Sequence, residues 1–381
     1  MRAIINGKLV LEDKIIDNGC IIFDEKIQKI GASLKTDGCE VIDAKNSLVM
    51  PGFIDIHIHG YKGYDTSDAD ENGMIKISGE IVKNGVTAWC PTTMTVEKSI
   101  IQNSLDIIKR LKTSGKTKAK VLGANVEGPF INPSKKGAQS EKYILKPDKN
   151  FVLDNADAIK LVTIAPEFDE NFDFIKSVTK NTDIAVSIGH TAADYNTAAE
   201  AARLGARHIT HLFNAMPPLN HREIGVIGAA FENDSVMCEL IADTFHVNKA
   251  LFGALYKIKG DNLILITDCM RAGGMSDGKY TLGGQEVEVK GIECRLKDGT
   301  IAGSILTMNK AVSNFYSAAK LPLCEVVKLA SLSPARSIGE DKLRGSLSEG
   351  KFSDIIISDE NFNIERTIVC GKDVYKKPQE F

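Results

Sequence analysis

The sequence predicts an α/β protein in which a (β/α)8 barrel of the TIM type is joined to a small β-sandwich domain formed by both chain termini. Between residues 51 and 340, strand-length apolar runs alternate with helix-like segments, as is typical of parallel strands covered by helices. Eight such runs occur, the number of strands in this barrel. They read FIDIHIHG, VTAWCPTT, KVLGANVEG, LVTIAPE, IAVSIGH, HITHLFN, VMCELIAD and LILITDC. Residues 1–50 and 341–381 consist instead of short β-like pieces with turn signals, which predict the small β domain.

The elements follow in order from local signals. In the first fifty residues, the Asn6-Gly7 pair separates two apolar runs and predicts a hairpin turn. The barrel begins at FIDIHIHG, and apolar residues at helical spacing predict helices over 74–82 and 100–111. Further helical segments follow most later runs, and the last ends near Ile338. A doubly wound open sheet is the alternative, but it accounts less well for ligand-type residues on at least five strand ends.

Composition excludes several classes of protein. The 381 residues carry a formal net charge of -3 and are 43% hydrophobic and 25% charged, so the sequence indicates a soluble globular protein without a nucleic-acid or membrane partner. The longest apolar runs fall short of the ~20 residues that a membrane span needs, and polar residues interrupt the first fourteen before a signal-peptide core could form. Eight scattered cysteines without a CxxC pair favour a reducing compartment. We therefore expect a cytoplasmic protein.

The first barrel run ends in a pair of histidines. Strand alternation places His57 and His59 on one face and isoleucines on the other, where helices would cover them. Two histidines two residues apart can reach one metal ion at the end of the strand. An HxH pair alone would fit core or surface histidines equally well, but further ligand-type residues lie at later strand ends.

Those residues are Glu127, His190 and His211, each at the end of an apolar run. Imidazoles together with one carboxylate suit a transition-metal ion, and Glu127 could bridge two ions. His208 lies three residues before His211, so an ideal strand would turn the two side chains to opposite faces, and we expect His208 to be structural.

Asp268 follows the last barrel run. A structural aspartate at such a place would need hydrogen-bond donors. A catalytic one would accept a proton from the attacking water and later deliver it to a leaving amine.

Together these segments resemble the motifs of the N-acetylglucosamine-6-phosphate deacetylases of the amidohydrolase superfamily, in the same order and over nearly the whole chain. The matching segments are PGFIDIHIHG, EGPF, SIGHT, THLFNAM, the Arg222 segment, IADTFHV, LITDCM and AGS. The HxH pair is generic to the superfamily, whereas EGPF together with THLFNAM is specific to this family. The resemblance implies a distorted TIM barrel with a small β-sandwich from both termini.

The resemblance also implies roles for single residues. Glu127, His190 and His211 would be the principal metal ligands and Asp268 the catalytic acid/base. Arg222 would grip a phosphate, to which a guanidinium is suited, and His246 would bond a sugar hydroxyl or the phosphate. The implied substrate contacts are Ala138, Gln139, Asn214, Ala215, Arg222, the segment from Asp243 to His246, Ile301, Ala302 and Gly303.

The sequence departs from some family members at two places. Some have a glutamine as the first residue of HxH and hold one metal, whereas His57 and His59 are both present here, so a second ion sharing Glu127 is expected. The cofactor would be one or two divalent ions per subunit, of Zn, Fe, Mn or Co. Some members also have a histidine at Gln139 that polarises the substrate carbonyl; here the metal or the Gln139 amide would do so. Family members are commonly homodimers in which phosphate-site residues reach across the interface.

The sequence thus predicts a metal-dependent amide hydrolase that converts N-acetylglucosamine 6-phosphate and water to glucosamine 6-phosphate and acetate, in amino-sugar catabolism and recycling. One rival acts on N-acetylgalactosamine 6-phosphate, which differs by the configuration of one hydroxyl. A cyclic-amide hydrolase is disfavoured, because many of these use a carboxylated lysine where Glu127 stands. A non-catalytic sugar-phosphate-binding barrel is disfavoured by Asp268 and the full set of ligands.

Overall fold

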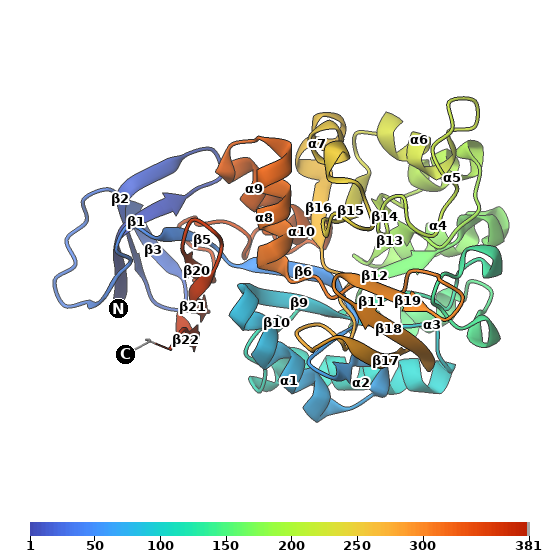
Figure 1. The fold of residues 1–381 in the computed structure, drawn as a ribbon, viewed down its shortest axis with the longest axis horizontal. Coiled ribbons are helices and arrows are strands. Elements are labelled where there is room, and N and C mark those ends of the chain that lie inside the picture. Colours follow the sequence, from blue (N-terminus) through green and yellow to red (C-terminus); the bar gives the residue numbers. More distant parts are fainter. Residues whose placement is uncertain (379–381) are drawn as a thin grey trace.

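A computed structural model describes residues 1–378, and its centre is a barrel of parallel strands surrounded by helices (Figure 1). The barrel strands pair in the order β6, β9, β11, β12, β13, β14, β15 and β16, with the short β10 also on β9. Their bounds are β6 (Phe53–Ile58), β9 (Val86–Thr93), β10 (Lys120–Val121), β11 (Ala124–Val126), β12 (Ile159–Ile164), β13 (Ala185–Ile188), β14 (His208–Ile209), β15 (Met237–Ile241) and β16 (Leu263–Ile266).

The barrel closes between its first and last strands. Ile58 and Cys269 form a parallel bridge, and the backbone N–H of Asp268 donates to the His57 carbonyl over 2.9 Å. The predicted barrel is confirmed, and the open-sheet alternative is wrong because the two edges of such a sheet would not meet. The third predicted run is interrupted at Gly123, whose φ is +147° and where a Cβ atom would lie 2.7 Å from Lys160 Cγ. It therefore forms β10 and β11 rather than one strand.

Helices cover the outside of the barrel as the apolar spacing predicts. In the first of them Met74, Ile77 and Ile81 are buried, and Asp70 caps its start by accepting from the Asn72 N–H. The helices are α1 (Glu71–Ile81), α2 (Lys98–Ser114), α3 (Lys149–Asp154), α4 (Asp173–Asn181), α5 (Tyr195–Arg203), α6 (Gly225–Glu232), α7 (Phe252–Lys259), α8 (Met308–Ala319), α9 (Leu323–Leu329) and α10 (Leu332–Ser337). Within residues 1–378, none of them combines the length and apolar character needed to cross a membrane.

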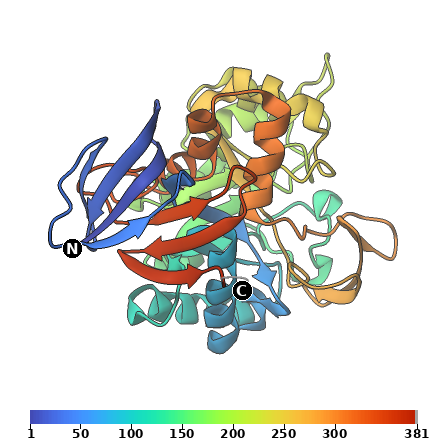
Figure 2. The same ribbon diagram turned by 60° about the vertical axis from the view of Figure 1, so that its left-hand side comes forward.

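Both ends of the chain build one second sheet, in which N-terminal and C-terminal strands lie side by side (Figure 2). Its order is β22-β21-β20-β5-β1-β2-β3, with β4 also on β1. Some of its buried side chains, among them Ile4, Ile21 and Ile355, form a core of their own, whereas others, among them Val10, Met50 and Ile356, pack into the core of the barrel. The strands are β1 (Arg2–Val10), β2 (Ile15–Phe23), β3 (Ile27–Gly31), β4 (Glu40–Asp43), β5 (Leu48–Pro51), β20 (Ile355–Ser358), β21 (Ile364–Val369) and β22 (Lys372–Lys376). The predicted fold class is confirmed. The division into domains at residues 50 and 340 stays a prediction, and residues 379–381 of its last segment lie outside the described residues.

The hairpin turn predicted at Asn6-Gly7 is wrong. Both residues lie within β1, where Asn6 has a φ of +55° and the pairing with β2 shifts register between Ile4 and Gly7. At this bulge β1 changes its parallel partner from β4 to β5. A Cβ atom on Gly7 would lie 2.5 Å from Val49 Cγ2, so the glycine permits close packing against β5. A residue in the left-handed conformation followed by glycine occurs in β-bulges as well as in hairpin turns. The sequence alone therefore does not show which of the two forms here.

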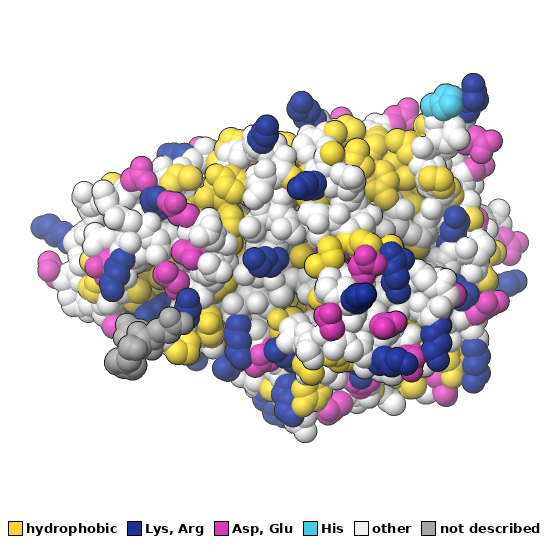
Figure 3. Space-filling view, viewed as in Figure 1, with side chains coloured by type: hydrophobic (Ala, Val, Ile, Leu, Met, Phe, Trp, Pro, Cys, Tyr) yellow, Lys and Arg dark blue, Asp and Glu magenta, His cyan; other side chains and the backbone are white. Residues whose placement is uncertain are grey.

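A further antiparallel sheet, which the sequence did not predict, is inserted after the last barrel strand. It consists of β17 (Gly278–Leu282), β18 (Gln285–Lys290) and β19 (Glu293–Leu296), and a small hairpin of β7 (Gly60–Tyr61) and β8 (Tyr64–Asp65) follows β6. On the face of the molecule in Figure 3, basic and acidic side chains are interspersed, in keeping with the small net charge.

Candidate metal and active site

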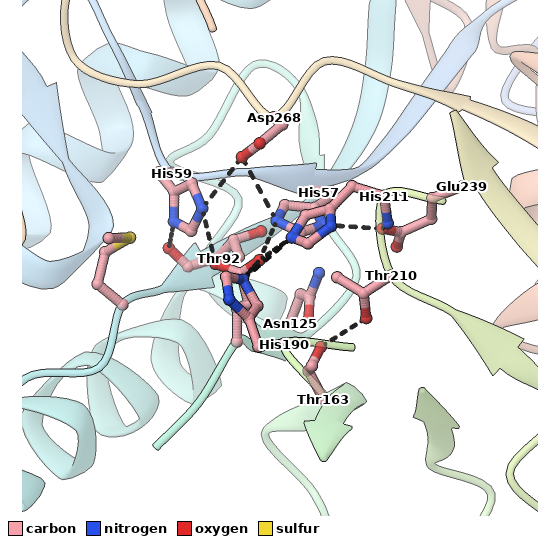
Figure 4. A network of polar contacts seen from close by, with 12 residues as sticks. His57, His59, Thr92, Asn125, Thr163, His190, Thr210, His211, Glu239 and Asp268 are labelled. Carbon is pink, nitrogen blue, oxygen red and sulfur yellow. Dashed lines mark hydrogen bonds and ion pairs between the residues drawn. The ribbon is translucent and has the colours of Figure 1, made fainter. Parts of the chain in front are cut away.

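The predicted ligands converge at the C-terminal ends of the barrel strands (Figure 4). They form two groups of three, His57, His59 and Glu127, and Glu127, His190 and His211, and within each group the ligand atoms lie within 4.8 Å of one another. Glu127 belongs to both groups.

The distances show how Glu127 joins the groups. Its Oε1 atom lies 2.9 Å from His211 Nε2 and 3.2 Å from His190 Nε2. The same oxygen is 3.3 Å from His57 Nε2, and Oε2 is 3.2 Å from His59 Nε2. Four imidazole nitrogens thus face one buried carboxylate.

This set of atoms fits divalent transition-metal ions. Nitrogen and oxygen ligands of this kind suit Zn, Fe, Mn and Co. The Nε2 atom of His57 is completely buried and lacks a hydrogen-bond partner among residues 1–378, although buried polar atoms are nearly always paired. A metal ion held by His57, His59 and Glu127 would satisfy it.

The backbone turns sharply where three of these residues stand. His190, His211 and Asp268 have φ values of +47°, +29° and +48°, in the left-handed region that costs a non-glycine residue about 1–3 kcal/mol. Each lies two residues beyond the end of its strand. The turn at His211 interrupts the strand alternation used to place His208. Both histidines lie in the barrel interior, and His208 contacts Ser187 Oγ through Nδ1 over 3.1 Å.

The far nitrogens of three histidines have their own acceptors. His57 Nδ1 lies 2.9 Å from Glu239 Oε2, His59 Nδ1 lies 3.2 Å from the Thr92 carbonyl, and His190 Nδ1 lies 2.9 Å from the Lys135 carbonyl. An acceptor at Nδ1 holds the ring proton on that nitrogen, which leaves Nε2 available to bind a metal ion. In all three histidines it is Nε2 that faces the Glu127 carboxylate.

Each buried carboxylate of the site lies beside histidines that can carry the opposite charge. Burial acts to raise the pKa of Glu127, but the charges of His57 and His190 outweigh it and hold that pKa well below its usual value. Burial also acts to raise the pKa of Asp268, but a hydrogen bond from His59 outweighs it and lowers that pKa. For His59 the balance is the reverse. Burial acts to lower its pKa, but Asp268 and Glu127 outweigh burial and raise that pKa to about 10. The two carboxylates therefore require positive charge beside them, which either protons or metal ions can supply.

Gln139 is bonded to Glu127 rather than free in the site. Its Nε2 donates to Glu127 Oε2 over 2.5 Å, and its Oε1 accepts from the Thr95 N–H over 2.6 Å. The Thr95 bond fixes which end of the amide faces the carboxylate. Gln139 therefore orients Glu127 with one N–H of its amide, and the residue also lines the cavity.

A cavity of ≈ 290 Å³ opens above the ligands. Its volume is close to the lower end of the range that is usual for small-molecule sites. Asp268, His59, Glu127, His190 and His211 lie in its wall, while His57 lies deeper. The other lining residues are Met94, Gly137, Ala138, Gln139, Phe213, Asn214, Ala215, His246, Leu282, Thr300, Ile301 and Gly303.

Comparison with known proteins assigns the family. The model of the amidohydrolase family matches residues 48–374. The N-acetylglucosamine-6-phosphate deacetylase of Bacillus subtilis (strain 168) is 37% identical over 374 residues, which cover 95% of this chain and 94% of that protein. The enzyme of the same name from Homo sapiens is 33% identical and covers 98% and 94%. The chain belongs to the N-acetylglucosamine-6-phosphate deacetylase family.

Solved structures of this family share the whole fold. The enzyme from Thermotoga maritima superposes with a TM-score of 0.89 at 32% identity and covers 98% of this chain and 100% of that one. A variant of the Mycobacterium smegmatis deacetylase, solved in complex with N-acetyl-D-glucosamine-6-phosphate, gives a TM-score of 0.91 at 27% identity and covers 98% and 99%. The predicted family is confirmed.

Arg222 and Ala302, which the deacetylase resemblance implied as contacts, lie elsewhere than in the cavity wall, and of the segment from Asp243 to His246 only His246 lines it. Arg222 is exposed on the loop between β14 and α6, so its guanidinium does not line the cavity of its own chain. Ala302 is completely buried in the barrel core, because neighbours Ile301 and Gly303 face the cavity and alternation turns Ala302 away.

Sequence reasoning missed Glu239, and it named Asp243 only within a segment of substrate contacts, not as the partner of His246. Glu239 lies within the apolar run VMCELIAD and contacts His57, and an acidic residue inside a strand buried on both faces could have signalled it. Asp243 accepts from His246: its Oδ2 lies 2.6 Å from His246 Nδ1, and Oδ1 accepts the His246 N–H over 2.8 Å. Asp243 thus orients the imidazole that lines the cavity.

The inserted sheet also contributes to the site without a sequence signal. Leu282, at the end of β17, is buried and lines the cavity beside Gly303. Met94, just after β9, lies near the turn at Gly283, where a Cβ atom would be 3.2 Å from Met94 Cε. Neither residue has a side chain whose chemistry points to a function, so only the fold reveals their place.

Proposed function

We propose that this chain removes the acetyl group from N-acetylglucosamine 6-phosphate, giving glucosamine 6-phosphate and acetate, in amino-sugar catabolism and recycling. One observation carries the proposal: Asp268 Oδ1 lies 3.2 Å from His59 Nε2, at the floor of a cavity whose ligand groups share Glu127. A carboxylate beside the proposed metal ligands and open to a substrate supports the role of a hydrolytic base for Asp268. Relatives that carry this activity in their names support it.

Asp268 performs the proton transfers in this proposal. A divalent ion held by the histidines and Glu127 would polarise the acetyl carbonyl and make water more acidic. Asp268 accepts the proton of the attacking water, and the protonated Asp268 donates it to the sugar nitrogen as the C–N bond breaks. Water supplies the oxygen of acetate, and the amine leaves with the proton from Asp268.

We also propose two ions per chain, one in each ligand group. Glu127 supports this because its carboxylate faces both groups: Oε1 lies near His57, His190 and His211, and Oε2 lies near His59. Zn, Fe, Mn and Co all suit the ligands, and the metal available to the cell would decide among them.

A homodimer would explain the position of Arg222. Its loop is exposed in the single chain, and a phosphate bound over a partner's cavity would lie within reach of such a loop if the interface brings the two together. His246 and Asn214 line the cavity of their own chain and would contact the sugar.

We propose the cytoplasm as the compartment, because all eight cysteines are free thiols.

The deciding experiment is acetate release from a panel of sugars, using protein with measured metal content. The panel contains N-acetylglucosamine 6-phosphate, its galactosamine epimer and both sugars without phosphate. The proposal expects the highest kcat/KM for N-acetylglucosamine 6-phosphate and loss of turnover after chelation. Preference for the epimer would reassign the substrate, and absence of acetate from every sugar with metal bound would overturn the proposed activity.

A further inference from the structure

Glu239 lies beneath both ligand groups and contacts each of them. It stands in the middle of β15, is completely buried, and points into the barrel (Figure 4). One of its oxygens, Oε2, lies 2.9 Å from His57 Nδ1 and 3.0 Å from the backbone nitrogen of His211. His57 belongs to one group and His211 to the other.

The contact with His57 decides which of its nitrogens can bind a metal ion. Glu239 accepts from Nδ1, so the proton stays on that side of the ring and Nε2 faces Glu127 and Asp268 at 3.3 and 3.6 Å. Metal-binding histidines are commonly held in this way by a carboxylate, which fixes the tautomer and the ring orientation.

The contact with His211 acts on the backbone. The His211 φ of +29° is unfavourable for a residue with a side chain and needs support from its surroundings. The hydrogen bond from its N–H to the buried carboxylate supplies such support. A charged acceptor forms a stronger bond than a neutral one would.

Asp55 is a second buried carboxylate in the barrel, and its contacts differ from those of Glu239. Asp55 accepts from Thr267 Oγ1 over 2.6 Å and touches the ligands through the backbone nitrogen of His57, at 3.3 Å. Asparagine at this position keeps the size of the side chain and one acceptor oxygen. The two carboxylates are equally buried, but Glu239 contacts a ligand ring and Asp55 does not.

We propose that Glu239 is a positioning residue that couples the two metal sites, by holding His57 Nε2 toward one ion and the His211 backbone in place for the other. This inference rests on the proposal of two ions per chain. It explains why a carboxylate, costly to bury, occurs inside an otherwise apolar strand.

The test is metal binding by Glu239→Gln, which keeps the size of the side chain and removes its charge. Competition with a chelator, using Zn²⁺ or Mn²⁺, should show about 10–100-fold weaker binding at the site of His57 and His59. The site of His190 and His211 should weaken less, because only its backbone support is altered. Asp55→Asn is the matched control and should leave both affinities within a few-fold of the wild type.

A double variant separates action through His57 from a general effect. In a His57→Ala background, Glu239→Gln should cause little further loss at the His57 site, since the ring it positions is already absent. If Glu239→Gln does not fold, Glu239→Asp carries the same test, because it keeps the charge but is too short to reach both donors.

The outcomes are distinct. Two ions bound with unchanged affinity in Glu239→Gln would overturn the inference alone, as would an equal loss in Asp55→Asn. One ion in the wild type would overturn both the two-ion proposal and the inference. Acetate release by the wild type is measured separately and reports on the proposed activity.

Discussion

At the scale of single residues, Asp268 combines two properties that a hydrolytic base needs. It lies in the cavity wall, and although burial acts to raise its pKa, the positive charge beside it lowers that pKa and favours the ionised form. The backbone at Asp268 is left-handed, and its side chain lines the cavity at the mouth of the barrel.

We expect Asp268→Asn to lower kcat about 10²–10⁴-fold, because an amide of the same shape cannot take up the proton. Metal content, measured by elemental analysis, should stay close to that of the wild type, since Asp268 is not part of either ligand group. Near-normal turnover in this variant would remove Asp268 from the mechanism.

Arg222 gives a prediction that depends on the substrate. If it grips the 6-phosphate, Arg222→Ala loses a charge-assisted contact of about 1.5–3 kcal/mol, or roughly ten- to a hundred-fold in kcat/KM. Unphosphorylated N-acetylglucosamine should be a poor substrate for both proteins and be hardly affected by the change. An equal loss with both sugars would instead assign Arg222 to the fold or to a subunit interface.

At the scale of elements, the end of β6 bears on the proposal of two ions. His57 on β6 and His59 directly after it supply every imidazole of one ligand group, while β13 and β14 lead to those of the other. The two groups can therefore be removed separately.

We expect the double variant His57→Ala/His59→Ala to bind one ion per chain where the wild type binds two, by elemental analysis after loading with excess metal under reducing conditions. Substantial activity should remain if the second ion only assists. His190→Ala, as the matched comparison, should abolish turnover. One ion in both the wild type and the double variant would leave His57 and His59 as supporting residues.

The barrel strands could be predicted because parallel strands are apolar throughout, and the gathering of the proposed ligands could be predicted because the ends of such strands meet at one edge. His57, Glu127 and His190 each follow such a run, and their chemistry marks them. The Asn6-Gly7 bulge could not be distinguished from a turn, because the change of partner from β4 to β5 depends on distant residues. Arg222 could not be placed either, since an exposed loop carries no periodicity.

At the scale of the whole molecule, a chain of ion pairs joins the barrel to the terminal sheet. Lys160 on β12 lies 2.9 Å from Glu340, Glu340 lies 3.5 Å from Arg344, and Arg344 lies 2.7 Å from Asp354, next to β20. Arg344 and Asp354 are both buried. Removing one partner of such a pair leaves an unpaired buried charge.

We therefore expect Arg344→Met to lower the free energy of unfolding by about 3–5 kcal/mol at neutral pH. Burial raises the pKa of Asp354 and Arg344 opposes it, so that pKa rises further without the arginine. A raised carboxyl pKa means that the folded protein keeps a proton that the unfolded chain releases, so stability is lost as pH rises above the ordinary aspartate range. The deficit relative to the wild type, measured by denaturant unfolding, should thus be larger at pH 8 than at pH 5.

The double variant Arg344→Met/Asp354→Asn is the control for this pH dependence. With no titrating group at residue 354, its deficit should be nearly the same at both pH values. A deficit of Arg344→Met that does not change with pH would show that the loss comes from packing rather than from the unpaired carboxylate.

The pairing of β5 with β20 also bears on how the protein is made. Pro51 pairs with Ile355 and Leu48 with Ser358, so the partner of β5 emerges from the ribosome only after the entire barrel has been synthesised. Until then one side of β5 presents unpaired N–H and C=O groups, which can join strands of other chains. The nascent protein therefore passes through a state in which its barrel can be complete while its N-terminal strands still have an open edge, and this interval is when it is most exposed to aggregation.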